Sequence, residues 1–183
     1  SAQKPNQVMD ALLSAYQDSY SNVHRGLHFL SEGSTDAYEA VRGKVADFIG
    51  AASGDEIVLT AGATMSLNLI AQSWALPRLQ AGDEILLSIA EHHANIVPWQ
   101  IVSEKTGAIV RAFPMETDGS FCMSAMTDMI STKTRIISIP HVSNVLGTVF
   151  PVADIAEHAR DVGALLVVDG CQGVVHMPVN VQA

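Results

Sequence analysis

The chain has 183 residues and is 48% hydrophobic, which is enough apolar material to bury a sizeable core within one domain. Its net charge is −9, from 19 acidic against 10 basic side chains, and Lys and Arg form no cluster, which argues against nucleic acid as a partner. No apolar run approaches the roughly 18 to 20 residues that a membrane span requires, so we expect a cytoplasmic protein without a membrane partner.

Two helices are expected in the first part of the chain. Asn6–Tyr20 and Thr35–Ile49 both carry helical periodicity, and the segment between them, Asn22–His28, is rich in polar side chains. We therefore expect residues 1–54 to form an N-terminal helical arm that packs either on a partner subunit or on another part of the same protein.

From residue 55 to residue 183, short β-rich apolar runs alternate with segments of helical period, which predicts βαβ units and a parallel sheet. The runs are continuously apolar, so helices should cover both faces of the sheet. The expected fold class is α/β, a three-layer sandwich with a mainly parallel sheet. The predicted strands are Glu56–Thr60, Glu84–Ile89, Ile109–Phe113, Arg135–Ile139 and Leu165–Val168. The predicted helices between them are Ala63–Leu76, Ala94–Thr106, Ser124–Ile130 and Val152–Val162.

Polar and small residues follow the predicted strands, where open parallel sheets usually bind their ligands. After Thr60, a turn with Gly62, Ala63 and Thr64 opens a helix whose free backbone N–H groups suit an anion such as a phosphate. The alternative is an ordinary strand-to-helix turn that Thr64 or Ser66 caps.

Two adjacent histidines, His92 and His93, follow the strand that ends at Ile89. Two interpretations of these rings are equally open: one flat ring lies over a ligand, or it caps the helix at the surface. Adjacent residues on a helix point to different sides, and a metal site prefers histidines four residues apart together with a third ligand. We therefore expect no metal site.

Asp169 ends the apolar run Leu165–Val168, a position that partly buries its carboxylate. A buried carboxylate requires a cation or hydrogen-bond donors, and a protonated pyridine nitrogen is one such cation. The alternative is a turn aspartate that nearby N–H groups satisfy.

The two cysteines have neither the number nor the spacing of a disulfide framework or a zinc site, and we expect reduced thiols. Cys171 lies beside Asp169, whose charge raises a thiol pKa, so Cys171 is interpreted as a small buried filler and not as a nucleophile. Cys122 begins a helix and is interpreted as a packing residue.

Six segments together resemble a known family. Four of them resemble class V aminotransferases, and these are Thr60–Thr64, Glu91–Trp99, His141–Gly147 and Val168–Gln172. Two more narrow the resemblance to the group II, Suf-type cysteine desulfurases and the selenocysteine lyases, and these are Asn22–His28 and Val175–Gln182. The resemblance covers essentially the whole chain with the motifs in order, and it implies the large domain of a fold-type I enzyme that uses pyridoxal 5'-phosphate.

The resemblance also implies roles for residues of the predicted site. Asp169 would pair with the pyridinium nitrogen of the cofactor, and His92 would stack on its ring and help to move protons. Thr64, with the backbone of Gly62 and Ala63, would hold the phosphate.

Four further residues receive roles in the same way. Gln172 would hydrogen-bond the phenolic oxygen of the cofactor, and Asn144 would lie near that oxygen and near the substrate carboxylate. His24 and Arg25 resemble family residues close to the active site near the dimer interface.

The chain also departs from the family pattern. Members continue into a Ser-Gly-His-Lys stretch whose lysine holds the cofactor covalently, but here no lysine follows Lys133. The loop with the sulfur-accepting cysteine, the arginine for the substrate carboxylate and the C-terminal small domain are missing too. We therefore expect a truncated and inactive part of the enzyme. Ala63 and Met65 stand where group II members often have threonine and glutamate.

The parent enzyme implied by the resemblance is a homodimer that converts L-cysteine to L-alanine and passes the sulfur as a persulfide toward iron–sulfur cluster assembly, with a sulfur-acceptor protein as a further partner. A selenocysteine lyase that uses L-selenocysteine, or another class V enzyme, is the nearest alternative. A non-catalytic interaction module that keeps the fold is a rival of another kind, and such a module would have no need to bind the cofactor.

Overall fold

The computed structural model of this protein describes residues 3–182. The chain divides into two compact units: the first comprises the residues up to Leu59 together with Asn180–Gln182, and the second comprises Thr60–Val179. No helix within the described residues is long and apolar enough to cross a membrane.

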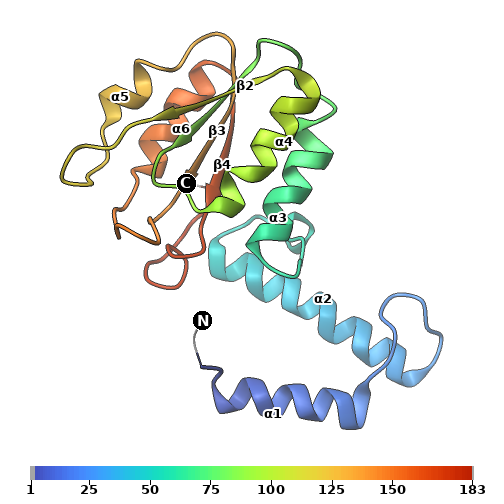
Figure 1. The fold of residues 1–183 in the computed structure, drawn as a ribbon. Helices are drawn as coiled ribbons and strands as arrows, with labels where there is room; N and C mark the ends of the chain where they lie inside the picture. The colour runs from blue at the N-terminus through green and yellow to red at the C-terminus, as the bar shows by residue number, and fades with distance from the viewer. Residues whose placement is uncertain (1–2, 183) are drawn as a thin grey trace. The chain divides into compact units, whose positions relative to one another are not determined.

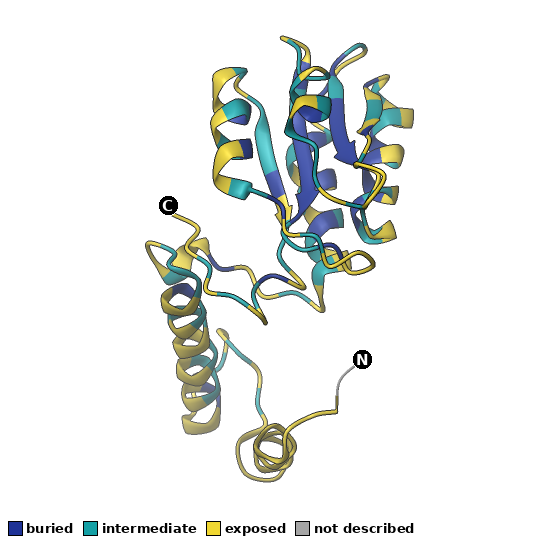
Figure 2. Cartoon of the chain, turned by 90° about the vertical axis from the view of Figure 1, so that its left-hand side faces the viewer, coloured by how far each residue is buried: buried dark blue, intermediate teal, exposed yellow. Residues whose placement is uncertain are grey.

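The first unit is helical, as expected. Helix α1 (Asn6–Ser14) continues into a π-helical turn, Ala15–Ser19, and neither segment buries a residue (Figure 2). Helix α2 (Phe29–Ile49) begins six residues before the predicted start, because the His28 ring accepts a hydrogen bond from the Ser31 N–H at its N-terminus (3.4 Å).

The predicted strand Glu56–Thr60 is wrong. Glu56 closes a short 3₁₀ turn, Gly54–Glu56, and Ile57–Thr60 pairs with no strand of the described chain. The backbone at Ile57 is extended, with φ −99° and ψ 120°, and Val58 is 68% exposed. A β-rich composition produces an extended chain, but a strand also requires a neighbour to accept its hydrogen bonds.

The second unit contains one parallel sheet with the strand order β2-β1-β3-β4. The other four predicted strands are confirmed to within one residue at either end. Their bounds are β1 (Glu84–Ser88), β2 (Ile109–Phe113), β3 (Thr134–Pro140) and β4 (Leu165–Asp169).

Helices cover both faces of this sheet (Figure 1), so the three-layer α/β sandwich is confirmed. One face carries α3 (Ala63–Ile70), which continues into the π-helical turn Ala71–Ala75, and α4 (Val97–Thr106), which the 3₁₀ turn His93–Asn95 precedes. The other face carries α5 (Met123–Thr127) and α6 (Val152–Asp161).

Alternation along the central strands divides the core between the two faces. Ile85 and Leu87 pack with Trp99 on the side of α3 and α4, whereas Leu86 and Ile137 pack on the side of α5 and α6. All five side chains are at least 98% buried, and the central strands are the darkest part of the sheet in Figure 2. The carboxyl ends of these strands are therefore held by a rigid, close-packed core.

Gly173 is a point of close backbone approach in the loop after β4. A Cβ atom added there would lie 2.7 Å from the ring Cγ of His141 and 2.9 Å from its Cβ, whereas a Cβ at Gly170 in the same loop would meet nothing within 4 Å. We expect Gly173→Ala to destabilise the fold by about 1–3 kcal/mol through overpacking. The measurement is the urea midpoint of Gly173→Ala beside Gly170→Ala as the matched control, and equal midpoints for the two variants would contradict it.

Candidate cofactor site

A hollow of about 370 Å³ lies at the carboxyl edge of the sheet, within the second unit. Its volume falls within the roughly 300–1,000 Å³ of small-molecule sites. The structure brings together in it every residue predicted for the cofactor except Gly62, which immediately precedes the lining. The hollow is lined by Ala63, Thr64, His92, Ala94, Pro140, Val142, Asn144, Asp169, Cys171 and Gln172.

The N-terminus of α3 presents free backbone donors beside the hollow. Gly62 is the N-cap, with φ 145° and ψ 172°, a conformation open to glycine, and no side chain caps the helix. The N–H groups of Ala63 and Thr64 have no hydrogen-bond partner among residues 3–182. Ser66 bonds the Thr60 hydroxyl (2.8 Å) and the Gly62 carbonyl, so the alternative of a turn capped by Thr64 or Ser66 is wrong. Two free donors at a helix N-terminus suit a phosphate.

His92 lines the hollow and at the same time caps the following turn. Its Nδ1 accepts a hydrogen bond from the Ala94 N–H (3.1 Å), so this nitrogen carries no proton and the neutral ring holds its proton on Nε2. The His93 ring stands nearly perpendicular, at 83° and with centroids 5.9 Å apart, and does not line the hollow. His92 therefore caps the turn, as one interpretation of the histidine pair expected, and its side chain also lines the hollow in which the other interpretation expected a ligand.

Asp169 is the last residue of β4, and its half-buried carboxylate lines the hollow. Its Oδ1 accepts a hydrogen bond from the Cys171 N–H (3.0 Å), as the turn interpretation expected. No Lys, Arg or His side chain within the described residues forms an ion pair with it. An anion at the wall of a hollow without a cationic partner suits a cationic ligand group such as a pyridinium nitrogen.

Asn144 and Gln172 complete the polar lining. Both side chains are exposed, and neither amide has a hydrogen-bond partner among residues 3–182. The Ser143 hydroxyl fixes the loop of Asn144, because it accepts from the N–H groups of Val145 (3.4 Å) and Leu146 (3.3 Å). The two free amides are thus available to oxygen atoms of a ligand.

Cys171 is exposed at the rim of the hollow, so its interpretation as a buried filler is wrong. The exposure arises because the chain turns sharply after Asp169 and leaves the core. Partial burial of the thiol, with the neighbouring Asp169 carboxylate, raises the pKa of Cys171 to about 11. The thiolate is therefore scarce at neutral pH, which agrees with the rejection of a nucleophilic role. Cys122 is the half-buried N-cap of α5.

Glu91 is a residue of this region to which the sequence analysis gave no role. Burial raises the pKa of its carboxyl to about 7, hydrogen bonds from Ser88 and Asn95 lower it, and the charge of Asp169 raises it further. The available signal was the spacing: a serine ends a buried strand, a glutamate follows three residues later, and an asparagine comes four residues after that. No group of three or more His, Cys, Asp or Glu side chains in residues 3–182 is arranged to hold a metal ion.

The two remaining predicted residues, His24 and Arg25, lie in the first unit and do not line the hollow. His24 has a left-handed backbone, φ 71°, which is rare for a residue other than glycine and is often found at functional sites. Arg25 is exposed and has no ion-pair partner among the described residues.

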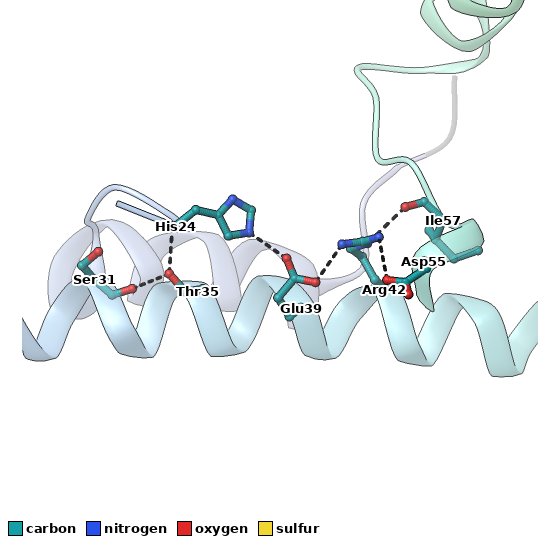
Figure 3. A network of polar contacts seen from close by, with 7 residues as sticks. All are labelled: His24, Ser31, Thr35, Glu39, Arg42, Asp55 and Ile57. Carbon is teal, nitrogen blue, oxygen red and sulfur yellow. Dashed lines mark hydrogen bonds and ion pairs between the residues drawn. The ribbon is translucent and has the colours of Figure 1, made fainter. Parts of the chain in front are cut away.

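A chain of polar contacts along α2 holds the His24 side chain (Figure 3). The His24 N–H donates to Thr35 Oγ1 (2.9 Å), and its Nε2 lies 2.7 Å from Glu39 Oε1. The other oxygen of Glu39 accepts from Arg42 Nη1 (2.9 Å), and Arg42 Nε donates to the Ile57 carbonyl (3.1 Å). The His24 ring bond is the largest cause that lowers the pKa of Glu39. The strained His24 is thus fixed by its own unit.

Comparison with known proteins identifies the family. The family model of class V aminotransferases matches residues 1–183, and the chain belongs to this family, whose cofactor is pyridoxal 5'-phosphate. It is 49% identical over 181 residues to a probable cysteine desulfurase of Vibrio cholerae and 46% identical over 181 residues to one of Synechocystis. Each alignment covers 99% of this chain, but only 45% and 43% of the respective relative. The chain therefore spans less than half the length of these curated relatives.

Solved structures agree with this assignment. One is the cysteine desulfurase CsdA of Escherichia coli in an S-sulfonic acid form, which superposes with a TM-score of 0.89 at 41% identity. The match covers 100% of the present chain and 46% of the CsdA chain. The apo cysteine desulfurase of Thermococcus onnurineus gives a TM-score of 0.92 at 36% identity. This match covers 100% of the present chain and 45% of the Thermococcus chain. The fold-type I assignment is therefore confirmed.

Proposed function

We propose that this chain is the cofactor-binding part of a pyridoxal-phosphate-dependent cysteine desulfurase, with residues 55–183 in its large domain and residues 1–54 as a helical arm. The observation that carries the proposal is one hollow that combines two features. Two backbone N–H groups at a helix N-terminus have no hydrogen-bond partner within residues 3–182, and the carboxylate of Asp169 forms no ion pair within the same residues. An anion site and a cation site in one small-molecule hollow fit a ligand with a phosphate and a pyridinium nitrogen.

The residues present suit each part of the cofactor. The N–H groups of Ala63 and Thr64, with the Thr64 hydroxyl, would bind the phosphate. Asp169 would hold a proton at the ring nitrogen, because an adjacent anion stabilises the protonated form. His92 would stack on the ring face and, through Nε2, donate or accept a proton. When bound, the cofactor supplies an electron sink for the bond changes in the amino-acid substrate.

Gln172 and Asn144 would orient the bound ligand through their free amides, Gln172 at the phenolic oxygen and Asn144 near that oxygen and the substrate carboxylate. His24 and Arg25 would serve the substrate or the dimer interface of a homodimer. These two roles rest on the family resemblance and on the strained, anchored backbone of His24.

The reaction proposed for the complete enzyme consumes L-cysteine and a cysteine thiol of the enzyme and gives L-alanine and an enzyme persulfide. The C–S bond of the substrate breaks, an S–S bond forms at the accepting thiol, and a proton takes the place of the sulfur on carbon. Cys171 is poorly suited as the acceptor because its pKa is about 11. The persulfide would then pass to an acceptor protein for iron–sulfur cluster assembly.

The test is to express the complete coding sequence and to measure alanine from L-cysteine, with L-selenocysteine as the competing substrate. We expect alanine with a thiol reductant present to regenerate the acceptor, and no turnover by the 183-residue chain alone, which has no lysine after Lys133. If the complete protein acts on L-selenocysteine alone, it is a selenocysteine lyase and the proposal of a cysteine desulfurase is wrong. A complete protein without cofactor would replace it by a non-catalytic module.

A further inference from the structure

The Glu91 carboxyl lies beside the hollow and is held by hydrogen bonds to both of its oxygens. The Ser88 hydroxyl donates to Oε1 and the Asn95 amide donates to Oε2, each at 2.7 Å. Glu91 is half-buried and does not line the hollow itself. Any effect of Glu91 on the hollow therefore passes through its neighbours.

Asn95 connects Glu91 to the core of the second unit. It is fully buried, and its Oδ1 accepts from Trp99 Nε1 (2.9 Å) and from the Ser138 hydroxyl (2.7 Å), both of which are fully buried as well. Both ends of its amide are thus fixed, and the network ties the end of β1 to the start of α4 and to the central strand β3. A satisfied buried network of this kind is rigid and permits one arrangement.

His92 lies between Glu91 and Asn95 in the sequence, and the same turn fixes its backbone and ring. The Asn95 N–H donates to the His92 carbonyl (2.8 Å), and the Ala94 N–H donates to Nδ1 of the His92 ring. Both bonds require the turn to keep its shape. The exposed His92 ring has no other hydrogen-bond partner among the described residues. Its orientation therefore depends on the turn, which Glu91 and Asn95 anchor on either side of it.

We propose that Glu91 is a positioning residue of the cofactor site, which together with Asn95 holds the His92 ring in one orientation and with its proton on Nε2. The inference rests on the proposed cofactor site. Its consequence is that a ring of fixed tautomer faces the hollow before any ligand arrives, so little ordering cost remains at the moment of binding.

Glutamine at position 91 can take over this role, because its carbonyl accepts from Asn95 while its amide donates to the Ser88 oxygen. The neutral form of Glu91 can keep the same two contacts, with its O–H donating to the Ser88 oxygen and its carbonyl accepting from Asn95. Alanine offers neither contact. Aspartate is one methylene shorter and cannot reach both partners. Glutamine keeps the contacts without the charge, aspartate keeps the charge without both contacts, and alanine keeps neither, so the three variants separate the geometry of the side chain from its charge.

The experiment reads the ring nitrogens of His92 by long-range ¹H–¹⁵N NMR of the cofactor-free 183-residue chain at about pH 8.5, where histidine rings are neutral. His92→Gln assigns the signal, and Glu104→Ala, an exposed residue of α4, is the control. We expect the Nε2–H form in the wild type, in Glu91→Gln and in the control. In Glu91→Ala and Glu91→Asp we expect the tautomer ratio to shift about fivefold, the equivalent of one lost hydrogen bond.

A wild-type ring with its proton on Nδ1, or averaged between both nitrogens, would overturn the inference. So would a wild-type tautomer ratio in folded Glu91→Ala or, if that variant does not fold, in Glu91→Asp. A shift in Glu91→Gln as large as that in Glu91→Ala would overturn it as well. Because the reading is taken without cofactor, these outcomes are independent of whether the hollow binds pyridoxal phosphate.

Discussion

Replacing Asp169 by Asn in the complete enzyme is expected to lower the rate of alanine formation from L-cysteine by roughly 10²–10³-fold while the protein stays folded. The uncharged amide cannot hold the ring nitrogen of the cofactor protonated. The fold should persist because the Asn oxygen can still accept the hydrogen bond from the Cys171 N–H. The measurement is the steady-state rate with the cofactor saturating.

The matched control for this variant is Asp161→Asn, which alters an exposed aspartate at the end of α6 with the same change of charge. We expect the control to retain the wild-type rate. An Asp169→Asn enzyme with the wild-type rate would remove Asp169 from the site, and a loss of rate shared by both variants would trace the effect to net charge.

Replacing Asn95 by Ala is expected to lower the free energy of unfolding of the chain by about 3 kcal/mol or more. The change removes three hydrogen bonds. It leaves the buried Trp99 Nε1 and Ser138 hydroxyl without a partner, at about 1–3 kcal/mol for each group, and takes one of the two hydrogen bonds from the half-buried Glu91 carboxyl. Urea unfolding followed by tryptophan fluorescence measures the effect. Gln100→Ala, at an exposed position of α4, is the control and should change stability by less than about 0.5 kcal/mol.

A loss of less than about 1 kcal/mol in Asn95→Ala would show that the network is relaxed or reached by water in solution. The buried core would then not be what holds the loop of His92. Such a result would weaken both the rigidity of the site and the role inferred for Glu91.

The sheet could be predicted from the sequence because its central strands are continuous apolar runs between turn residues, and β1 and β3 are buried on both faces. The strand predicted at Glu56–Thr60 failed for a non-local reason: its composition is suited to a strand, but no other strand pairs with it. The start of α2 at Phe29 could not be predicted, because Ser31-Glu32-Gly33-Ser34 in its first turns has the composition of a turn.

The site could be predicted in part for a similar reason. His92 and Asp169 lie at or shortly after the carboxyl ends of β1 and β4, so the order of elements alone brings them to one edge of the sheet. Thr64 could be predicted from the turn at Gly62 that opens α3, although the strand predicted before this turn does not form. For Glu91 the sequence held only a local signal, its spacing from Ser88 and Asn95. The bond that ties Asn95 to the core could not be predicted, because its partner Ser138 lies 43 residues further along the chain. The exposure of Cys171 likewise depends on the path of the loop after β4.

Binding of pyridoxal phosphate to the 183-residue chain tests the central claim most directly. We expect reversible binding with a dissociation constant no tighter than about micromolar, because the hollow is open and only non-covalent contacts are available. Pyridoxal, which lacks the phosphate, should bind more weakly. Ala63→Pro removes one free N–H at the first position of α3, where proline is tolerated.

Titration by fluorescence, repeated with pyridoxal and with Ala63→Pro, is the measurement, and borohydride reduction before mass spectrometry checks for covalent attachment. We expect Ala63→Pro to weaken pyridoxal phosphate about tenfold, the equivalent of one charge-assisted hydrogen bond, and to leave pyridoxal unchanged. If the wild-type chain binds the two ligands equally, if Ala63→Pro has no effect, or if one lysine is labelled stoichiometrically, the hollow at the carboxyl edge of the sheet is not the site that we propose.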